Sequence, residues 1–339
     1  MGSLAVTSRA WTAQAGRIAF TLALTTAATV IAPARAQEPA GHTRSDIEWL
    51  QAIQNAAQKT NYSGTIYYQQ GAEVRVSRIV HQFASGVSRE RLQMLDGERR
   101  EYVRKADEVQ CLIPDTKRVI LEKRPVGGNF PALSSAAPTD ILRYYSLRRG
   151  SVERVADVEC QVIVLEPKDK ARYGYRLWVE RNTGLLLRAQ MLGESQDVIE
   201  QMAFTEVRLG EAADPSRMKP SWSTDGWQVE KPDYKKVDIA RDWSLVLPDG
   251  FRQLSSVMRR FTHNGGREAL QAVYSDGLAT LSIFIQSDHG GAVLGVAKNR
   301  GPINAYVNRL GDTMVTVVGE VPPATVRDVA LSVKAREAR

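Results

Sequence analysis

The sequence contains few of the residues from which metal centres and redox sites are built. Its 339 residues include two cysteines and four histidines: Cys111, Cys160, His42, His81, His263 and His289. The cysteines form no C-x-x-C pair, and no two histidines stand at a metal-ligand spacing such as H-E-x-x-H. We therefore predict no bound metal and no catalytic dithiol. Exposed loop positions are the simplest interpretation of His42, His263 and His289.

Catalytic motifs are missing as well. The chain contains no G-x-S-x-G nucleophile elbow, no G-x-x-x-x-G-K phosphate loop and no G-x-G-x-x-G dinucleotide signature. Covalent and acid–base catalysis need a positioned base beside a nucleophile, and the sequence shows no such group of residues. We predict that the protein is not an enzyme, has no catalytic residues and uses no cofactor.

Long apolar runs are missing after the N-terminal segment. Arg9 and Arg17 precede the uncharged run IAFTLALTTAATVIA, and the segment ends at Ala34-Arg35-Ala36. This pattern is typical of a cleaved secretory signal, whereas a membrane-spanning helix would be longer and less rich in Ala and Thr. No cysteine follows the cleavage site to carry a lipid anchor. We predict a signal peptide over residues 1–36 and an exported, soluble chain that begins at Gln37.

A strong charge of either sign is also missing. The predicted mature chain carries 42 basic and 38 acidic residues, because the signal removes three arginines. Such a mild excess, in an exported chain, argues against nucleic acid and fits contact with anionic lipid head groups. The densest basic stretch is GERREYVRK, from Gly97 to Lys105. It is either a solvated turn and strand edge or an anion contact made by Arg99, Arg100 and Arg104.

Cys111 and Cys160 lie in the strand-like runs VQCLIP and ECQVIVLEP. An even cysteine count in an oxidising compartment favours a disulfide, and neighbouring strands could bring the two sulfurs within bonding distance. The alternative is a pair of separate buried thiols that pack as small apolar side chains.

The first predicted domain, residues 37–209, is rich in strands. Ser45 and Glu48 form a capping box before a helix that carries Trp49, Leu50, Ile53, Ala56 and Ala57 on one stripe. Strand-like runs follow one another from Tyr62 to Leu209, which predicts an antiparallel meander. The run is interrupted from Gly127 to Leu147 by a Pro-, Gly- and Ala-rich piece, either a mobile flap or a cover over one sheet face.

A polar, Pro-containing linker, residues 210–232, separates this domain from a small α+β domain, residues 233–339. Asp276-Gly277 predicts a two-residue hairpin turn between alternating apolar runs. Helical spacing over Ile303, Tyr306, Val307 and Leu310 predicts one helix. Pro322-Pro323 predict the start of another, with Val326, Val329, Ala330 and Val333 on its apolar stripe.

The hairpin RYGYRLWVERNTGLLLRAQML, Arg172 to Leu192, offers the most apolar face of the chain. Its first strand alternates Tyr173, Tyr175, Leu177 and Val179, and its second strand alternates Leu185, Leu187, Ala189 and Met191. A loosely covered sheet face of this kind can take an acyl chain, with Tyr173, Tyr175, Leu177, Val179 and Leu187 as the candidate lining. Alternatively, the face is ordinary core beneath the Trp49 helix. Trp178 is out of this register, and the pattern does not decide whether it is packed or exposed.

Several stretches resemble the MucB/RseB family, in order and over nearly the whole mature chain. They include SGTIYYQQG, LDGERREYVR, the run from Arg148 to Leu192, VYSDGLATLSIFI and VVGEVPPATVRDVALSVK. The hairpin also resembles the W-[VI]-[DE]-x-x-T-G-L hairpin of the LolA lipoprotein carriers. The resemblance implies an α+β fold in which a large unclosed antiparallel β-barrel with covering helices is joined to a small C-terminal domain.

The resemblance also implies a function. Members of the family are periplasmic negative regulators of the envelope-stress sigma factor. They bind the periplasmic part of a membrane anti-sigma factor, of the RseA or MucA type, and shield it from the first regulated protease. Binding of lipopolysaccharide or other acylated envelope material releases them. For this chain the resemblance implies a periplasmic location, and self-association as a homodimer is a further hypothesis.

The hairpin and the helix start of the small domain suggest a rigid platform for a partner peptide, with Tyr274, Asp276, Gly277 and Glu320 as candidate contacts. A competing hypothesis is a periplasmic lipid or lipoprotein carrier without a regulatory partner, which would need only the first domain. A hydrolase is disfavoured by the missing motifs. The retained small domain favours the regulator.

Overall fold

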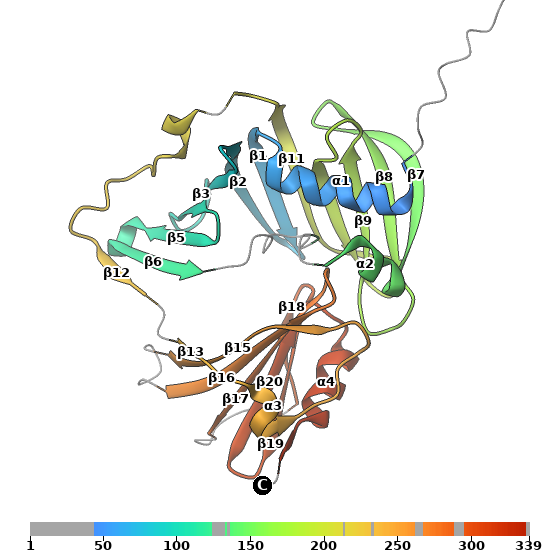
Figure 1. Cartoon of the computed structure of the whole chain (residues 1–339), viewed down its shortest axis with the longest axis vertical. Coiled ribbons are helices and arrows are strands. Elements are labelled where there is room, and N and C mark those ends of the chain that lie inside the picture. Colours follow the sequence, from blue (N-terminus) through green and yellow to red (C-terminus); the bar gives the residue numbers. More distant parts are fainter. Residues whose placement is uncertain are drawn as a thin grey trace, which may run out of the picture. The chain divides into compact units, whose positions relative to one another are not determined.

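The computed structural model describes residues 44–123, 133, 136–212, 214–231, 234–261, 267–287 and 295–336 (Figure 1). The predicted signal peptide, His42, His263, His289 and the first part of the Gly127–Leu147 segment lie outside these residues. In the part of the chain that is described, no helix is long and apolar enough to cross a membrane.

Twelve strands form one sheet, and nearly all neighbours in it are antiparallel. Its order is β12-β6-β5-β4-β3-β2-β1-β11-β10-β9-β8-β7, so β12 and β7 are edges and the sheet is unclosed. β12 pairs with β6 in parallel. The strands are β1 (Tyr62–Gln70), β2 (Glu73–Ala84), β3 (Val87–Met94), β4 (Glu101–Lys105), β5 (Glu108–Ile113), β6 (Arg118–Lys123), β7 (Tyr145–Val155), β8 (Val158–Pro167), β9 (Gly174–Glu180), β10 (Leu186–Leu192), β11 (Val198–Leu209) and β12 (Gln228–Glu230).

Helix α1 (Asp46–Lys59) lies across one face of this sheet (Figure 1). The predicted capping box is confirmed, because Glu48 accepts a hydrogen bond from the Ser45 N–H and Ser45 accepts one from the Glu48 N–H. The turn after β9 touches this helix. Gly184 there has φ of 85°, and a Cβ would stand 2.7 Å from the Ala52 carbonyl carbon. Glycine is therefore required at this turn both for its backbone conformation and for its close approach to the helix.

Helix α2 (Pro138–Tyr144) lies in the second half of the Gly127–Leu147 segment. Ile141 on α2 and Leu133 before it are buried in the core of the first sheet. Gln54 of α1 holds this stretch in place by donating to the carbonyls of Leu133 and Ala136, at 2.6 and 2.7 Å. The described part of the segment is thus a cover over the sheet face, which was one of the two alternatives.

A second, seven-stranded sheet has the order β13-β15-β16-β17-β20-β19-β18. Apolar side chains of its middle strands pack with helix α4 and bury Leu281, Ile283, Val315 and Val317 completely. Strands β14 and β21 form a separate two-stranded sheet. The elements of this part of the chain are β13 (Tyr234–Lys236), α3 (Ile239–Asp242), β14 (Trp243–Ser244), β15 (Arg252–Phe261), β16 (Arg267–Ser275), β17 (Thr280–Ser287), β18 (Gly295–Arg300), β19 (Ile303–Leu310), β20 (Thr313–Gly319), α4 (Pro323–Ser332) and β21 (Lys334–Ala335).

Two local predictions in this region are wrong and one is confirmed. Residues 303–310 form strand β19, paired with β18 and β20, because sheet pairing overrides an apolar spacing that fits either structure. The turn at Asp276-Gly277 spans four residues, since Ser275 pairs with Thr280. The final helix is confirmed as α4, with Val326, Val329 and Ala330 buried.

The polar segment after β11 is bound to the first sheet along its length. It includes the short helix η2 (Pro215–Met218) and strand β12, which lies beside β6. Glu101, fully buried on β4, accepts a hydrogen bond from the Ser221 N–H and forms an ion pair with Arg91 at 2.7 Å. We refer below to residues 44–231 as the first lobe and to residues 234–336 as the second lobe; both lie in one compact unit.

Candidate functional site

The apolar face of the Arg172–Leu192 hairpin lies in the core of the first lobe. Tyr175, Leu177 and Val179 are at most 1% exposed and pack with Trp49, Leu50 and Ile53 of α1 and with Ile141 of α2. Tyr173 belongs to the same cluster. The alternative of a packed core beneath the Trp49 helix therefore describes the structure, and an acyl chain would have to displace this cover.

Leu187 belongs to a different apolar cluster. The pairing of β10 with β9 shifts between Leu186 and Arg188, which is a β-bulge. Beyond it Ala189 and Met191 belong to the cluster of Leu177, whereas Leu187 belongs to a second cluster that includes Ala56, Tyr62 and Phe204. The predicted alternation along the second strand is wrong at this residue, because one extra residue in a strand breaks the period of two.

The β16–β17 turn of the second lobe inserts into the first lobe. Leu278 is 2% exposed and belongs to the same apolar cluster as Tyr175 and Leu177. At the neighbouring Gly277, with φ of 104°, a Cβ would overlap Ala136 and lie 3.4 Å from Ile141. The two lobes are therefore joined by shared apolar core as well as by the connecting chain.

A buried ion pair stands at the base of this turn. Arg172 Nη1 lies 2.6 Å from Asp276 Oδ2, and both side chains are fully buried. Arg172 also donates to the Asp249 carbonyl at 2.7 Å, and Tyr145 donates to Asp276 at 3.1 Å. The other oxygen of Asp276 accepts from the backbone N–H groups of Leu278 and Ala279. The pair is thus surrounded by the hydrogen bonds that a buried charge needs.

Polar contacts extend this junction between the lobes. Asn304 donates to the Tyr173 hydroxyl at 3.0 Å, and Thr325 donates to the Ala171 carbonyl at 3.0 Å. Two carboxyls lie in the same region. The pKa of Glu200 is raised to about 7, chiefly by burial and to a lesser extent by the negative charge of the nearby Glu320 carboxylate. Burial also raises the pKa of Glu320. The junction therefore contains an acidic pair from the two lobes that favours its protonated form.

Three of the predicted partner contacts, Asp276, Gly277 and Glu320, lie in this junction, whereas Tyr274 is buried in the core of the second lobe. Tyr274 and Asp276 are 5% and 3% exposed, Gly277 is buried against α2, and Glu320 is half-buried. A partner peptide could reach Asp276 or Gly277 only if the lobes parted. Their role as partner contacts stays a prediction, and Leu278 at the apolar tip of the turn is covered by the first lobe.

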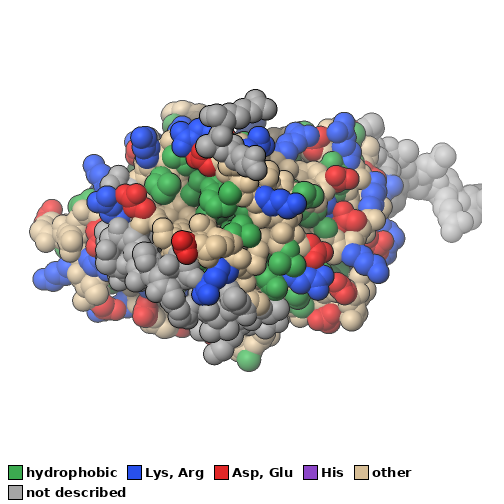
Figure 2. All heavy atoms as spheres, turned by 90° about the horizontal axis from the view of Figure 1, so that it is seen from below, with side chains coloured by type: hydrophobic (Ala, Val, Ile, Leu, Met, Phe, Trp, Pro, Cys, Tyr) green, Lys and Arg blue, Asp and Glu red, His purple; other side chains and the backbone are tan. Residues whose placement is uncertain are grey.

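Apolar side chains are exposed elsewhere on the second lobe. Val246 and Leu331 are 71% and 52% exposed, and they lie close together because Ser332 bonds the backbone of Val246. On the face drawn in Figure 2, hydrophobic side chains gather in the middle and charged side chains of both signs surround them. Apolar patches with a charged rim are typical of protein contact surfaces.

The predicted basic cluster does not present free cations. Arg99 pairs with Asp115, Arg100 pairs with Glu98, and Arg104 pairs with Glu90. All three guanidinium groups thus have a carboxylate partner within the chain. Arg99 and Arg100 fit the alternative of a solvated turn, whereas β4, which carries Arg104, lies between β3 and β5 and is not an edge strand.

The predicted disulfide is wrong, because no bond joins Cys111 to Cys160. Cys111 lies on β5 and Cys160 on β8. Strands β4, β3, β2, β1, β11, β10 and β9 all stand between β5 and β8 in the sheet order. The strands that could have brought the sulfurs together are therefore not neighbours. Burial raises the pKa of the Cys160 thiol to about 12.

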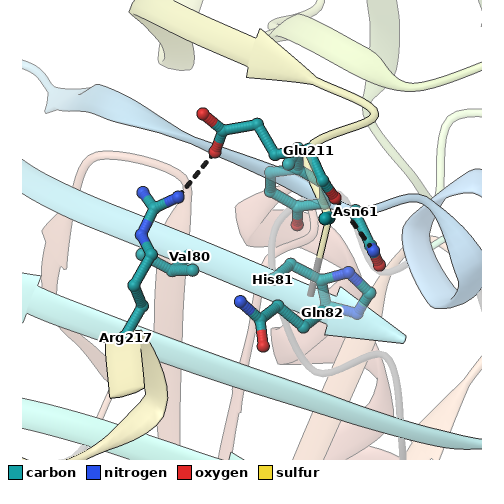
Figure 3. A pocket seen from close by; sticks show the side chains of 8 residues that line it. Asn61, Val80, His81, Gln82, Glu211 and Arg217 are labelled. Carbon is teal, nitrogen blue, oxygen red and sulfur yellow. Dashed lines mark hydrogen bonds and ion pairs between the residues drawn. The ribbon is translucent and has the colours of Figure 1, made fainter. Parts of the chain in front are cut away.

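A shallow polar hollow lies where the segment after β11 meets β1 and β2 (Figure 3). Arg217 reaches Glu211 at 2.6 Å, and Gln82 donates to the Asp214 carbonyl. His81 is fully buried, with its ring nitrogens 2.7 Å from the Thr60 carbonyl and 2.8 Å from Ser88 Oγ. Burial lowers the pKa of His81, so the ring is neutral. These contacts fasten the segment to the sheet.

No group of three or more His, Cys, Asp or Glu side chains in the described ranges is arranged to hold a metal ion.

The junction residues Arg172, Glu200, Asn304 and Thr325 were not predicted from the sequence. Arg172 begins the hairpin as a single cation before an aromatic run, which is a weak signal. Asn304 and Thr325 have no local signal, because their partners are more than a hundred residues away.

The fold and the junction define a class: a two-lobed α+β protein in which an unclosed antiparallel sheet, covered by a helix, is locked to a smaller sheet. Two family models match the chain, the MucB/RseB N-terminal domain over residues 45–222 and the MucB/RseB C-terminal domain over residues 238–334. The chain therefore belongs to the MucB/RseB family.

Individual relatives agree with this assignment. The chain is 32% identical over 302 residues to the sigma factor AlgU regulatory protein MucB of Pseudomonas aeruginosa, which covers 87% of this chain and 93% of that protein. It is 26% identical over 294 residues to the sigma-E factor regulatory protein RseB of Salmonella typhimurium, with 85% and 90% covered. A crystal structure of MucB in complex with MucA(peri) matches at 31% identity with a TM-score of 0.68, over 87% of this chain and 100% of that one.

Proposed function

We propose that this protein is a periplasmic regulator that binds the periplasmic part of a membrane anti-sigma factor of the RseA or MucA type. The observation that carries the proposal is the match to the MucB–MucA(peri) complex, which extends over both lobes. A carrier without a partner would not need the second lobe or its buried junction with the first. The bound segment is shielded from regulated proteolysis. The signal peptide directs the protein to the periplasm and is cleaved after Ala36.

Acylated envelope material, such as lipopolysaccharide, releases the partner in this proposal. The sheet face that carries Leu177 continues across the strand pairs to half-buried apolar side chains of β1–β6, which include Ile66, Leu92, Met94, Tyr102 and Ile120. These side chains are partly accessible, whereas Leu177 is fully buried. They form the surface on which an acyl chain would first bind.

The junction offers a route by which the two ligands affect each other. If lipid favours one arrangement of α2 and the inserted turn, and the anti-sigma segment favours another, each ligand must weaken the other by the same factor. Couplings of about 1–3 kcal/mol would change partner affinity roughly 5- to 150-fold. Asp276 is central to this route because it bonds Arg172, Tyr145 and the turn that carries Leu278.

Capture from an envelope extract on the immobilised mature chain, followed by mass spectrometry, tests the partner. A single-span anti-sigma factor is expected in the eluate. Its purified periplasmic segment should then resist protease when the chain is bound, and short-chain lipopolysaccharide should remove that protection. Binding of lipopolysaccharide by a chain that captures no anti-sigma factor would instead support the carrier.

A matched pair of variants tests the route. Asp276→Asn should change the effect of lipopolysaccharide on partner affinity. Asp328→Asn, which alters an exposed ion pair with Arg327 on α4, should not. An unchanged lipopolysaccharide effect in a folded Asp276→Asn protein would exclude the junction as the route while leaving partner binding intact.

A further inference from the structure

Two arginines stand on the face of the hairpin opposite to its apolar core face. Arg176 on β9 and Arg188 on β10 are half-buried, and the pairs Arg176↔Gln190 and Trp178↔Arg188 place them diagonally on neighbouring strands. Side chains in diagonal positions are about 7–8 Å apart at their origins, within the reach of two guanidinium groups. Both can therefore contact one ligand.

Neither arginine has a carboxylate partner. The Arg176 side chain makes no ion pair or hydrogen bond with another described residue. The Arg188 side chain donates one hydrogen bond, to the Gln201 side chain at 3.2 Å. Other half-buried arginines of this sheet differ: Arg91 pairs with Glu101, and Arg118 pairs with Glu230. Two uncompensated cations on one partly buried face leave positive charge that an anion would neutralise.

The groups around these arginines are held in fixed positions. The Arg188 guanidinium lies 4.5 Å from the centre of the Trp178 ring, and the Trp178 N–H donates to Glu153 at 2.7 Å. Trp178 is 4% exposed. A guanidinium stacked on a buried, anchored indole loses little freedom when it binds a ligand, which favours affinity.

Polar atoms on the same face remain without partners. Gln190 is 5% exposed and donates to Gln201 at 3.0 Å, but its side-chain oxygen is buried without a hydrogen bond. Arg188 Nε is also buried and unbonded. Gln201 continues the row by donating to Gln69 at 2.7 Å. Buried polar atoms are nearly always satisfied, so an acceptor and a donor left open side by side indicate a bound group that carries both functions.

We propose that Arg176, Arg188 and Gln190 form a binding site for a phosphate-class oxyanion. The two guanidinium groups would share the oxygens of the anion, and the Gln190 oxygen would accept a hydrogen bond from a protonated phosphate oxygen or from a hydroxyl beside the phosphate. Phosphate suits the pair better than a simple carboxylate, because its oxygens spread over three directions and can serve two forks at once. This proposal does not depend on the proposed function.

Isothermal titration of the full mature chain with inorganic phosphate at up to about 10 mM tests the site. Arg176→Gln and Arg188→Lys should each weaken phosphate binding about ten- to hundredfold, since each removes charge-assisted or forked hydrogen bonds. Arg78→Gln, at an exposed arginine on β2, is the matched control and should bind like the unaltered chain. Circular dichroism of each variant verifies the fold.

Vesicles distinguish the sources of the phosphate group. If a lipid head group is the ligand, phosphatidylcholine vesicles that contain phosphatidic acid should bind the chain and lose binding in the two arginine variants. If the ligand is soluble, free phosphate should bind the chain and the vesicles that contain phosphatidic acid should not. Absence of phosphate binding by the unaltered chain, or equal binding by a folded Arg176→Gln/Arg188→Lys double variant, would overturn the proposal.

Discussion

At the scale of single residues, the fully buried Arg172–Asp276 pair joins the two lobes. We expect Asp276→Asn to lower the free energy of unfolding by up to about 3–5 kcal/mol, because it removes the fully buried counter-ion of Arg172 and leaves only the partly exposed Asp169. Urea unfolding measures this change. The exposed pair Arg327–Asp328 is the control, where Asp328→Asn should cost less than about 1 kcal/mol. Equal small effects at both sites would show that the junction is open in solution.

Glu200 predicts how stability depends on pH. Its pKa is raised to about 7 in the folded chain by burial and by Glu320, above the ordinary value of 4.5. The folded state therefore binds a proton that the unfolded state releases, so this contribution is fully present below pH 4.5 and is lost as pH rises through about 7. The loss amounts to about 3 kcal/mol. Unfolding between pH 5 and pH 8 should show a shallower fall for Glu200→Gln; parallel curves would contradict the assignment.

Cys111 and Cys160 should both react with a thiol reagent once the chain is unfolded. Labelling of the denatured, unreduced chain is expected to modify Cys111 and Cys160, since no disulfide joins them in the structure. In the native chain Cys160 should react far more slowly than Cys111, because Cys160 is fully buried and its pKa is raised to about 12. A denatured chain without reactive thiols would show that a disulfide forms after all.

At the scale of elements, the β16–β17 turn acts as the connection between the two cores. Leu278→Ala should lower the free energy of unfolding by about 2–5 kcal/mol, because a fully buried leucine is removed from the first lobe's core. Leu331→Ala on α4 is the control, since that side chain is 52% exposed. If Leu278→Ala costs no more than Leu331→Ala, the turn is not inserted in solution.

At the scale of the whole molecule, the shared core makes the two lobes one folding unit. Differential scanning calorimetry of the mature chain should show a single transition, because Leu278, Arg172 and Asn304 all bond or pack across the junction. In Asp276→Asn the transition should split into two, as each lobe keeps its own apolar core. Two transitions in the unaltered chain would mean that the lobes unfold independently.

The proposed signal peptide has its own test. If it is cleaved after Ala36, N-terminal sequencing of the exported chain will begin at Gln37.

Local patterns were sufficient for the features that depend on neighbours in the chain. The capping box at Ser45, the meander of strands and the Pro-initiated α4 could all be predicted, because each is determined by interactions within a few residues. The family resemblance added the pathway, which no residue pattern contains. Local patterns failed at 303–310, where apolar spacing suits a helix or a strand and the partner strands decided.

Distant partners decided the rest. Cys111 and Cys160 are separated because the strand order places seven strands between β5 and β8, and that order depends on long-range pairing. Asp276 looked like an exposed turn residue, yet it is buried because Arg172, more than a hundred positions earlier, neutralises it. Arg99, Arg100 and Arg104 looked like free cations, but carboxylates on adjacent strands and turns pair with them. Whether a charge is free, paired or buried depends on which segments meet in space, so only the tertiary structure could determine it.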